Sequence, residues 1–318
     1  MTKWYSTPGR SEPRREGSKL TVMRWVAGLI VATAAVVAAP SGASLDPRDL
    51  DGTWTYATMT PLERPQEYAG KERLSPEEAA AFEQRTNARQ AATNNTAGPD
   101  WWDPGTRTLL DRRTSLIVDP ANGRLPALTA EAQARAAARA QARRDRGPST
   151  NVEDLATNER CLLWATAGPP MLPGVYNNNV RFVVTHDAVV IFNEMIHDAR
   201  IVPLDGRRRT GIRRWQGESL GHWDGSTLVI ETINFTDKTS VRGSDERLHL
   251  IERLTRTDAD TISYRFTIED PTVWSAPWSV EFPLRKTTDR IFEYACHEGN
   301  FRSVEGILRA SMVQLSKP

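Results

Sequence analysis

Residues 219–235 read SLGHWDGSTLVIETINF, and this stretch decides the fold class. Asp224-Gly225 is a strong two-residue turn signal between two runs that are rich in β-branched, aromatic and other apolar residues. The runs at 219–223 and 226–235 therefore predict the two strands of a β-hairpin. Similar paired runs recur through the second half of the chain.

Three further hairpins and one single strand follow from the same pattern. Turn residues separate paired runs at 181–185 and 188–195, at 248–255 and 261–268, and at 278–284 and 290–297. Residues 197–204 predict one more strand. Most of these strands, at least eight in all, are sequential neighbours, which makes them antiparallel. Because closure hides the edges of a long meander, we predict a mainly β fold that closes into a barrel.

The first half of the chain predicts helices around an early strand. Residues 50–56 alternate Trp and Tyr with small polar residues and indicate a strand. Ser75-Pro76-Glu77-Glu78 forms a capping box in front of an alanine-rich helix. A second helix is predicted at 129–146, with Thr129 as its cap. We expect two or so helices from residues 75–146 to pack outside the barrel.

The N-terminal residues 1–43 have the layout of a leader and signal peptide. An uncharged apolar run of about 15 residues follows Arg24 and ends before Ser41-Gly42-Ala43. A membrane anchor is the alternative, but the run is shorter than the roughly 18–20 apolar residues that span a bilayer. We therefore expect a periplasmic or secreted protein without stable membrane insertion after cleavage. The mature part, 44–318, is predicted to be a single barrel domain with a helical insertion at about 60–160.

Charge and cysteine content limit the partners of the mature chain. Removing residues 1–43 leaves 35 basic and 38 acidic side chains, a net charge near −3, so we expect no nucleic-acid partner.

Cys161 and Cys296 are the only cysteines. In an oxidising compartment they favour a disulfide, with two buried free thiols as the alternative.

Polar residues cluster where the predicted strand at 188–195 ends. Asn193, Glu194, His197, Asp198 and Arg200 lie within eight positions. In an unbroken strand Glu194, Asp198 and Arg200 share one face and His197 lies on the other, unless a bend near Met195-Ile196 relaxes this alternation. One interpretation makes His197 a general acid or base with Glu194 or Asp198 as its carboxylate. The alternative is an ion pair of Arg200 with either acidic residue.

A proline-rich loop precedes the predicted strand at 181–185. Tyr176, Asn177, Asn178 and Asn179 follow a stiff run of prolines at 169–173 and offer uncharged donors and acceptors. They are candidate ligand-binding residues together with Arg200, although asparagines also form turns by binding their own backbone. Trp101 and Trp102 lie outside any predicted strand and are further candidates for stacking on a ligand. Plugging one end of the barrel is their alternative role.

The usual fingerprints of metal and cofactor sites are missing from this sequence. No short His-x-His or His-x-x-x-His pair, Gly-x-Ser-x-Gly elbow, Gly-x-Gly-x-x-Gly turn or P-loop is present. We therefore predict no bound metal and no cofactor.

Two resemblances accompany these patterns. Gly52-x-Trp54 in front of an antiparallel meander resembles the opening of lipocalin-like (calycin) barrels, which implies a lipocalin-like barrel. Taken whole, the chain is similar to a group of secreted bacterial proteins. This second resemblance rests on the segments at 62–65, 168–174, 176–179, 193–200 and 296–300. It implies export but no activity.

Three functions fit these observations. The first is an exported barrel that binds a small, partly apolar ligand, oriented by the asparagine loop and Arg200. The second is a cofactor-independent lyase, isomerase or hydrolase that uses His197 and a carboxylate, so the sequence leaves enzymatic activity open. The third is a structural envelope protein without a ligand. Neither the ligand nor the oligomeric state can be read from the sequence.

Overall fold

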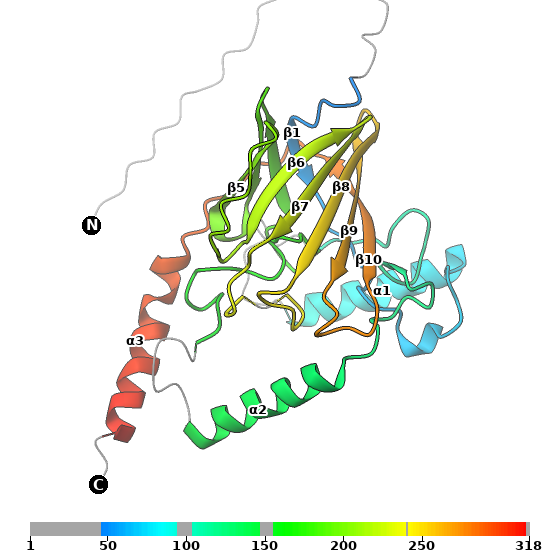
Figure 1. The fold of residues 1–318 in the computed structure, drawn as a ribbon. Helices are drawn as coiled ribbons and strands as arrows, with labels where there is room; N and C mark the ends of the chain where they lie inside the picture. The colour runs from blue at the N-terminus through cyan, green and yellow to red at the C-terminus, as the bar shows by residue number, and fades with distance from the viewer. Residues whose placement is uncertain (1–45, 94–103, 147–154, 240, 316–318) are drawn as a thin grey trace, which may run out of the picture. The chain divides into compact units, whose positions relative to one another are not determined.

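Three of the four predicted hairpins form, and they belong to one antiparallel sheet. The computed structural model describes residues 46–93, 104–146, 155–239 and 241–315. In this part of the chain nine strands follow one another in the order β5-β4-β3-β1-β10-β9-β8-β7-β6, and β2 pairs with β10 off this path. Figure 1 shows the run of neighbouring strands from β6 to β10. The sheet is nearly closed into a barrel, which confirms the predicted fold class.

The elements have the following bounds. The strands are β1 Gly52–Thr55, β2 Ile117–Asp119, β3 Asn179–Val184, β4 Ala188–Asn193, β5 Asp198–Pro203, β6 Glu218–Asp224, β7 Thr227–Ile233, β8 His249–Asp258, β9 Thr261–Glu269 and β10 Trp278–Lys286. The helices are α1 Pro76–Thr93, α2 Ala130–Arg146 and α3 Cys296–Leu315, and short 3-10 turns lie at Gln66–Tyr68 and Met195–His197.

The hairpin that decided the fold class forms one residue later than predicted. Asp224 on β6 pairs with Thr227 on β7, so the two-residue turn is Gly225-Ser226. Gly225 has a φ of +61° and Ser226 does not have a positive φ, which is the pattern of a type II′ turn. Glycine meets the need for a positive φ at the first central position without steric cost.

The predicted strand at 290–297 is wrong. Residues 287–295 form no strand, and Cys296 begins the helix α3. The edge of β10 that a following strand would need is occupied, because Trp54 and Thr55 of β1 pair with Lys286 and Arg285. The early strand β1 lies between β3 and β10 and thereby joins the two halves of the barrel.

Side chains close the remaining seam between β5 and β6. These strands end the sheet path and do not share a hydrogen-bond ladder. A Cβ added at Gly221 on β6 would lie 2.9 Å from Val202 of β5 and 2.8 Å from Leu204 just beyond it. The seam is therefore packed tightly at Gly221, where a larger residue would require the Val202 or Leu204 side chain to shift.

The two predicted helices are present, and both caps are confirmed. The amide of Glu78 donates to the Ser75 hydroxyl over 3.2 Å, while the Ser75 amide donates to the Glu78 carboxylate over 2.8 Å. The amide of Ala132 donates to the Thr129 hydroxyl over 3.1 Å at the start of α2. Both helices lie outside the sheet (Figure 1), as predicted, and α3 is a third helix that was not predicted.

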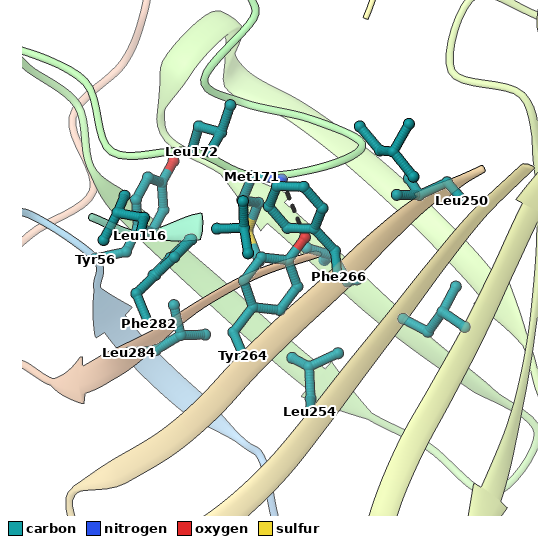
Figure 2. Packing of buried hydrophobic residues seen from close by; sticks show 14 of the residues in the cluster. Tyr56, Leu116, Met171, Leu172, Leu250, Leu254, Tyr264, Phe266, Phe282 and Leu284 are labelled. Carbon is teal, nitrogen blue, oxygen red and sulfur yellow. Dashed lines mark hydrogen bonds between the residues drawn. The ribbon is translucent and has the colours of Figure 1, made fainter. Parts of the chain in front are cut away.

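The inward faces of the strands form the core. Alternating residues on β8, β9 and β10 are buried, as the two-residue period of a strand requires. Tyr264 packs against Phe282 and Phe266 with ring centroids 5.3 and 5.9 Å apart, and Met171 lies beside them (Figure 2). Large side chains thus occupy this part of the interior.

The two ends of the barrel differ. At the hairpin end, short turns at 185–187, 225–226 and 259–260 join the strands. At the other end, which we call the loop end, β3 begins at Asn179 and β4 ends at Asn193. At this end the longer segment 155–178 leads into β3, and the segment 234–248 joins β7 to β8. Most of the candidate residues that the structure describes lie at the loop end.

Candidate ligand site

A buried ion pair spans the interior of the barrel. Arg200 on β5 donates from Nη1 to Oε2 of Glu252 on β8 over 2.5 Å, and from Nη2 to Oε1 over 2.9 Å. The two side chains are 7% and 0% exposed. Burial lowers the pKa of the Arg200 guanidinium, but the adjacent Glu252 carboxylate outweighs this effect and the pKa lies above its ordinary value. Arg200 is therefore positively charged, and its guanidinium is paired with the Glu252 carboxylate.

Tyr264 extends the ion pair to the loop that precedes β3. Its hydroxyl donates to Oε1 of Glu252 over 2.7 Å and accepts the backbone amide of Met171 over 3.1 Å, the bond dashed in Figure 2. Burial, together with the Glu252 charge, raises the pKa of Tyr264 well above its ordinary value, so the hydroxyl keeps its proton. The network holds the loop at Met171 against the interior.

This arrangement gives Arg200 a different environment from the one expected. The sequence suggested Arg200 as a ligand-binding residue, or as the partner of Glu194 or Asp198. Its guanidinium instead binds Glu252, which lies 52 positions further along the chain. A ligand that reached Arg200 would have to displace a buried carboxylate, which is strongly unfavourable. A ligand site at the loop end does not require this displacement.

The buried carboxylate of Glu194 organises the asparagine loop. Glu194 is 1% exposed, and its Oε1 accepts the backbone amide of Phe292 over 2.8 Å. The amide of Asn179 and the side chains of Asn177 and Asn179 also bind this carboxylate. Burial raises the pKa of Glu194, although these hydrogen bonds act in the opposite direction. The structure thus joins Glu194 to the asparagine loop, a contact that the sequence pattern did not predict.

Asn178 has the turn-forming role that was the alternative for this loop. Its Oδ1 accepts the amide of Gly174 over 2.7 Å, and its Nδ2 donates to the Gly174 carbonyl over 3.1 Å. Asn177 has a φ of +52°, a left-handed conformation that asparagine tolerates well. The three asparagines therefore shape the loop from within.

His197 lies on the outside of the barrel. The bend that the sequence allowed for is present, because Ile196 and His197 have φ values of +64° and +57°. The His197 side chain is exposed, and its ring packs edge-on against Phe192 with centroids 4.7 Å apart. The bend therefore turns the imidazole towards solvent and Phe192.

The three proposed acid–base residues have separate partners. Asp198 accepts a hydrogen bond from the side chain of Gln216, and burial raises the pKa of Asp198. Glu194 binds the asparagine loop, and His197 contacts Phe192. Catalysis by these residues stays a prediction, and the geometry does not strengthen it.

The predicted disulfide between Cys161 and Cys296 is present. Their Cα atoms lie 5.9 Å apart, and the bond ties the start of α3 to the turn around residue 161. Asn300 donates to both sulfur atoms over 3.4 Å. A disulfide fits an oxidising compartment. It also holds the start of α3 beside the asparagine loop, where both border one cavity.

A cavity that we call the tryptophan cavity lies at the loop end and has a volume of about 320 Å³. Its apolar walls include Leu163, Trp164, Pro169, Pro170, Leu172, Trp215 and Val241. Thr157, Thr239 and Arg242 supply the polar side chains among the described lining residues. An apolar cavity with a few polar groups is typical of small-molecule sites.

A second cavity, which we call the tyrosine cavity, lies beside the disulfide and has a volume of about 470 Å³. It is lined by Tyr176, Asn177, Phe292, Glu293, Tyr294, Ala295, Cys296 and Asn300. Two candidate ligand-binding residues, Tyr176 and Asn177, therefore face a cavity. Burial and a hydrogen bond with Tyr294 raise the pKa of Tyr176, so its hydroxyl is neutral.

Trp164 connects the two cavities. It lines the tryptophan cavity, and its ring packs against Tyr176 and Tyr294 of the tyrosine cavity with centroids 6.0 and 6.2 Å apart. The proline-rich loop thus borders the tryptophan cavity with Pro169 and Pro170 and the tyrosine cavity with Tyr176.

Several predictions fall outside the described residues. These are the signal peptide and leader at 1–43, Trp101 and Trp102.

Within the described ranges, no group of three or more His, Cys, Asp or Glu side chains is arranged to hold a metal ion. None of the described helices combines the length and the apolar character that a membrane crossing requires.

Sequence reasoning missed the interior network and the tryptophan cavity. Glu252 could have been found by strand alternation, because it shares a face with the apolar Leu250 and Leu254 and must point inward with them. Trp215 and Arg242 carry no comparable local signal, since they lie in connecting segments that only the fold brings together.

Comparisons with known proteins assign no family to the chain. No family model matches it, and neither the curated proteins nor the solved structures contain a match. Membership of the lipocalin-like proteins and of the secreted bacterial group stays a prediction.

Proposed function

We propose that this chain is an exported binding protein for a small, partly apolar molecule. The ligand sits in the tryptophan cavity at the loop end rather than in the middle of the barrel. The observation that carries this proposal is the cavity itself: about 320 Å³ enclosed largely by two tryptophans, two prolines and aliphatic side chains. Its volume lies near the lower end of the range for ligand pockets, roughly 300–1,000 Å³, which suits a molecule of one or two rings.

The walls of the cavity are held in place before a ligand arrives. Thr239 donates from Oγ1 to the Trp215 carbonyl over 2.8 Å, and the Arg160 guanidinium lies 5.6 Å from the centre of the Trp215 ring. Pro169 and Pro170 are buried in the loop that Tyr264 holds at Met171. Walls fixed in advance favour binding because less conformational entropy is lost when the ligand enters.

The tryptophan cavity supports binding rather than acid–base catalysis. None of its described lining residues is a histidine or a carboxylic acid, the groups that most often transfer protons near neutral pH. Tryptophan rings and a guanidinium instead provide stacking surfaces and a fixed positive charge.

Export is part of the proposal. The Cys161–Cys296 disulfide supports an oxidising destination, and the apolar run after Arg24 supports translocation. Mass spectrometry of the protein secreted from the native host, or recovered from its periplasm, should give a mature N-terminus at Ser44. A chain that stays uncleaved in the cytoplasm would contradict this part.

A thermal-shift screen of the mature, disulfide-bonded chain against small apolar and aromatic metabolites tests the binding function. A ligand at 100 times its Kd should stabilise the native state by about 2.7 kcal/mol and raise the melting temperature. The shift should vanish in Trp215→Ala, which removes one wall of the tryptophan cavity.

Trp223→Ala is the matched control. Trp223 lies near the hairpin end, and Arg48 lies 5.5 Å from the centre of its ring, so it shares the cation–π environment of Trp215 without lining the cavity. Its ligand-induced shift should equal that of the wild type. The proposal fails if no compound shifts the wild type, or if the two variants respond alike.

A further inference from the structure

We infer that the ligand of the tryptophan cavity is an apolar carboxylate, whose negative charge is met by Arg242. This inference rests on the proposed function and adds the chemical class of the ligand. It follows from the charges around the cavity and from the backbone that presents Arg242.

Among the described residues that line the cavity, one side chain carries a positive charge and none carries a negative charge. Arg242 is the one charged side chain among the described lining residues. No described acidic side chain forms an ion pair with it. A second guanidinium, that of Arg160, lies against the Trp215 ring that forms part of the wall. An anion is therefore attracted to this cavity, and a cation is repelled.

The turn that carries Arg242 does not by itself explain an arginine. Val241 and Ser244 exchange two backbone hydrogen bonds, of 2.8 and 3.0 Å, around Arg242 and Gly243. These two residues have φ values of +55° and +97°, the pattern of a type I′ turn, in which asparagine, aspartate and glycine are preferred. Arginine at the first of these positions is strained, and such strain is concentrated at functional sites. The turn places Arg242, an exposed residue, among those that line the cavity.

The apolar walls set the rest of the ligand. A single planar guanidinium matches a carboxylate with two parallel hydrogen bonds. The rings of Trp164 and Trp215 suit an aromatic or aliphatic group. We therefore assign a carboxylate attached to a small apolar or aromatic body. A phosphate monoester is the competing anion, and the experiment distinguishes the two.

Four compounds with one carbon skeleton test the inference by titration calorimetry of the mature, disulfide-bonded chain. They are 3-phenylpropanoate, 3-phenylpropan-1-ol, 3-phenylpropan-1-amine and 3-phenylpropyl phosphate. The carboxylate should bind about tenfold more tightly than the alcohol, because one charge-assisted interaction replaces a neutral one. The amine should bind most weakly.

Substitutions at Arg242 test whether this residue causes the preference for the carboxylate over the alcohol. Arg242→Asn removes the charge and tolerates the left-handed backbone, so the variant should melt at or above the wild-type temperature. Its preference for the carboxylate over the alcohol should fall below about twofold, whereas Arg242→Lys, which keeps the charge but loses the two parallel hydrogen bonds, should keep only part of it. Arg253→Gln, a control near the hairpin end where Arg253 pairs with Asp224, should leave the preference unchanged.

The outcomes separate the ligand class from the binding function. Equal binding of the carboxylate and the alcohol, or tightest binding of the phosphate, would overturn the carboxylate assignment and leave the binding function standing. If Arg242→Asn still prefers the carboxylate over the alcohol, Arg242 does not bind the ligand. If none of the four compounds binds although another apolar compound of the screen does, the ligand class is wrong. If no compound of either set binds, both proposals fail.

Discussion

The guanidinium of Arg200 and the carboxylate of Glu252 form two hydrogen bonds, of 2.5 and 2.9 Å, inside the barrel. Arg200 lies on β5, at one end of the sheet path, and Glu252 lies on β8, near the other end. The pair therefore joins strands that share no ladder hydrogen bonds, on either side of the nearly closed seam. Tyr264 adds a third member to this network.

Glu252→Leu should be strongly destabilising, because it leaves the Arg200 charge buried without a partner. We expect a loss of about 3–5 kcal/mol in the free energy of unfolding, measured by urea denaturation. The double variant Arg200→Met/Glu252→Leu should recover much of this loss, since neither charge remains. Glu231→Gln, at an exposed position on β7, should change stability by no more than about 0.5 kcal/mol. A loss below about 1 kcal/mol for Glu252→Leu would contradict the buried pair.

Tyr264→Phe should uncouple the proline-rich loop from the barrel interior. The substitution removes the hydroxyl that donates to Glu252 and accepts from the Met171 amide. We expect a cost of about 1–3 kcal/mol and faster hydrogen exchange of the Met171 amide, which is left without its acceptor. Tyr68→Phe, which removes a hydroxyl that accepts from exposed Arg85, is the control and should have little effect. Unchanged exchange at Met171 would argue against the anchor.

Glu218 should make stability depend on pH in the acid range. Burial raises the pKa of its carboxyl, but hydrogen bonds from Thr210, Asn234 and Gly211 outweigh this and lower the pKa from 4.5 to about 2. Because the pKa is lower in the folded state, this contribution to stability is fully present above about pH 4.5. It is lost as the pH falls through about 2.

Urea denaturation at a series of pH values measures this contribution. Glu218→Gln should be less stable than the wild type at neutral pH. The difference should shrink steadily between about pH 4.5 and pH 2. Glu231→Gln, at an exposed position, is the control. Its difference in stability from the wild type should not shrink in this pH range. A difference for Glu218→Gln that is independent of pH would contradict the assigned hydrogen bonds.

Loss of the disulfide should destabilise the whole barrel, because the loop that it closes includes every strand from β3 to β10. Cys161 and Cys296 are 135 positions apart. The chain-entropy model gives a stabilisation of about 4–5 kcal/mol for a loop of this length. Cys161→Ser and the Cys161→Ser/Cys296→Ser double variant should therefore unfold at lower urea concentration than the wild type. Dithiothreitol should produce the same loss in the wild type and none in the double variant, and a reducing agent without effect on the wild type would contradict the prediction.

The fold was largely predictable because its strands carry local signals. Apolar residues alternate around short turns at 181–195, 219–235 and 248–268, and the helix caps at Ser75 and Thr129 satisfy backbone amides within one turn. The strand predicted at 290–297 failed for a non-local reason. Its sequence suits a strand, but β1 already pairs with the edge of β10 that this strand would need.

The candidate site was less predictable because its residues come from connecting segments. Tyr176 and Asn177 were selected as ligand-binding residues from the loop sequence, and both line the tyrosine cavity. Trp215 and Arg242 meet in the tryptophan cavity only because the segments at 204–217 and 234–248 both reach the loop end. No spacing along the chain encodes that meeting.

The sequence by itself determined three of the four predicted hairpins and the two helix starts, since each depends on neighbouring residues. It also determined the cysteine pairing, because the chain has only two cysteines. Only the tertiary structure decided that β1 lies between β3 and β10, that Arg200 faces Glu252, and that Trp164, Trp215 and Arg242 surround one cavity. These relationships join residues far apart in the chain. They exist only once burial of the apolar strand faces has brought distant segments together.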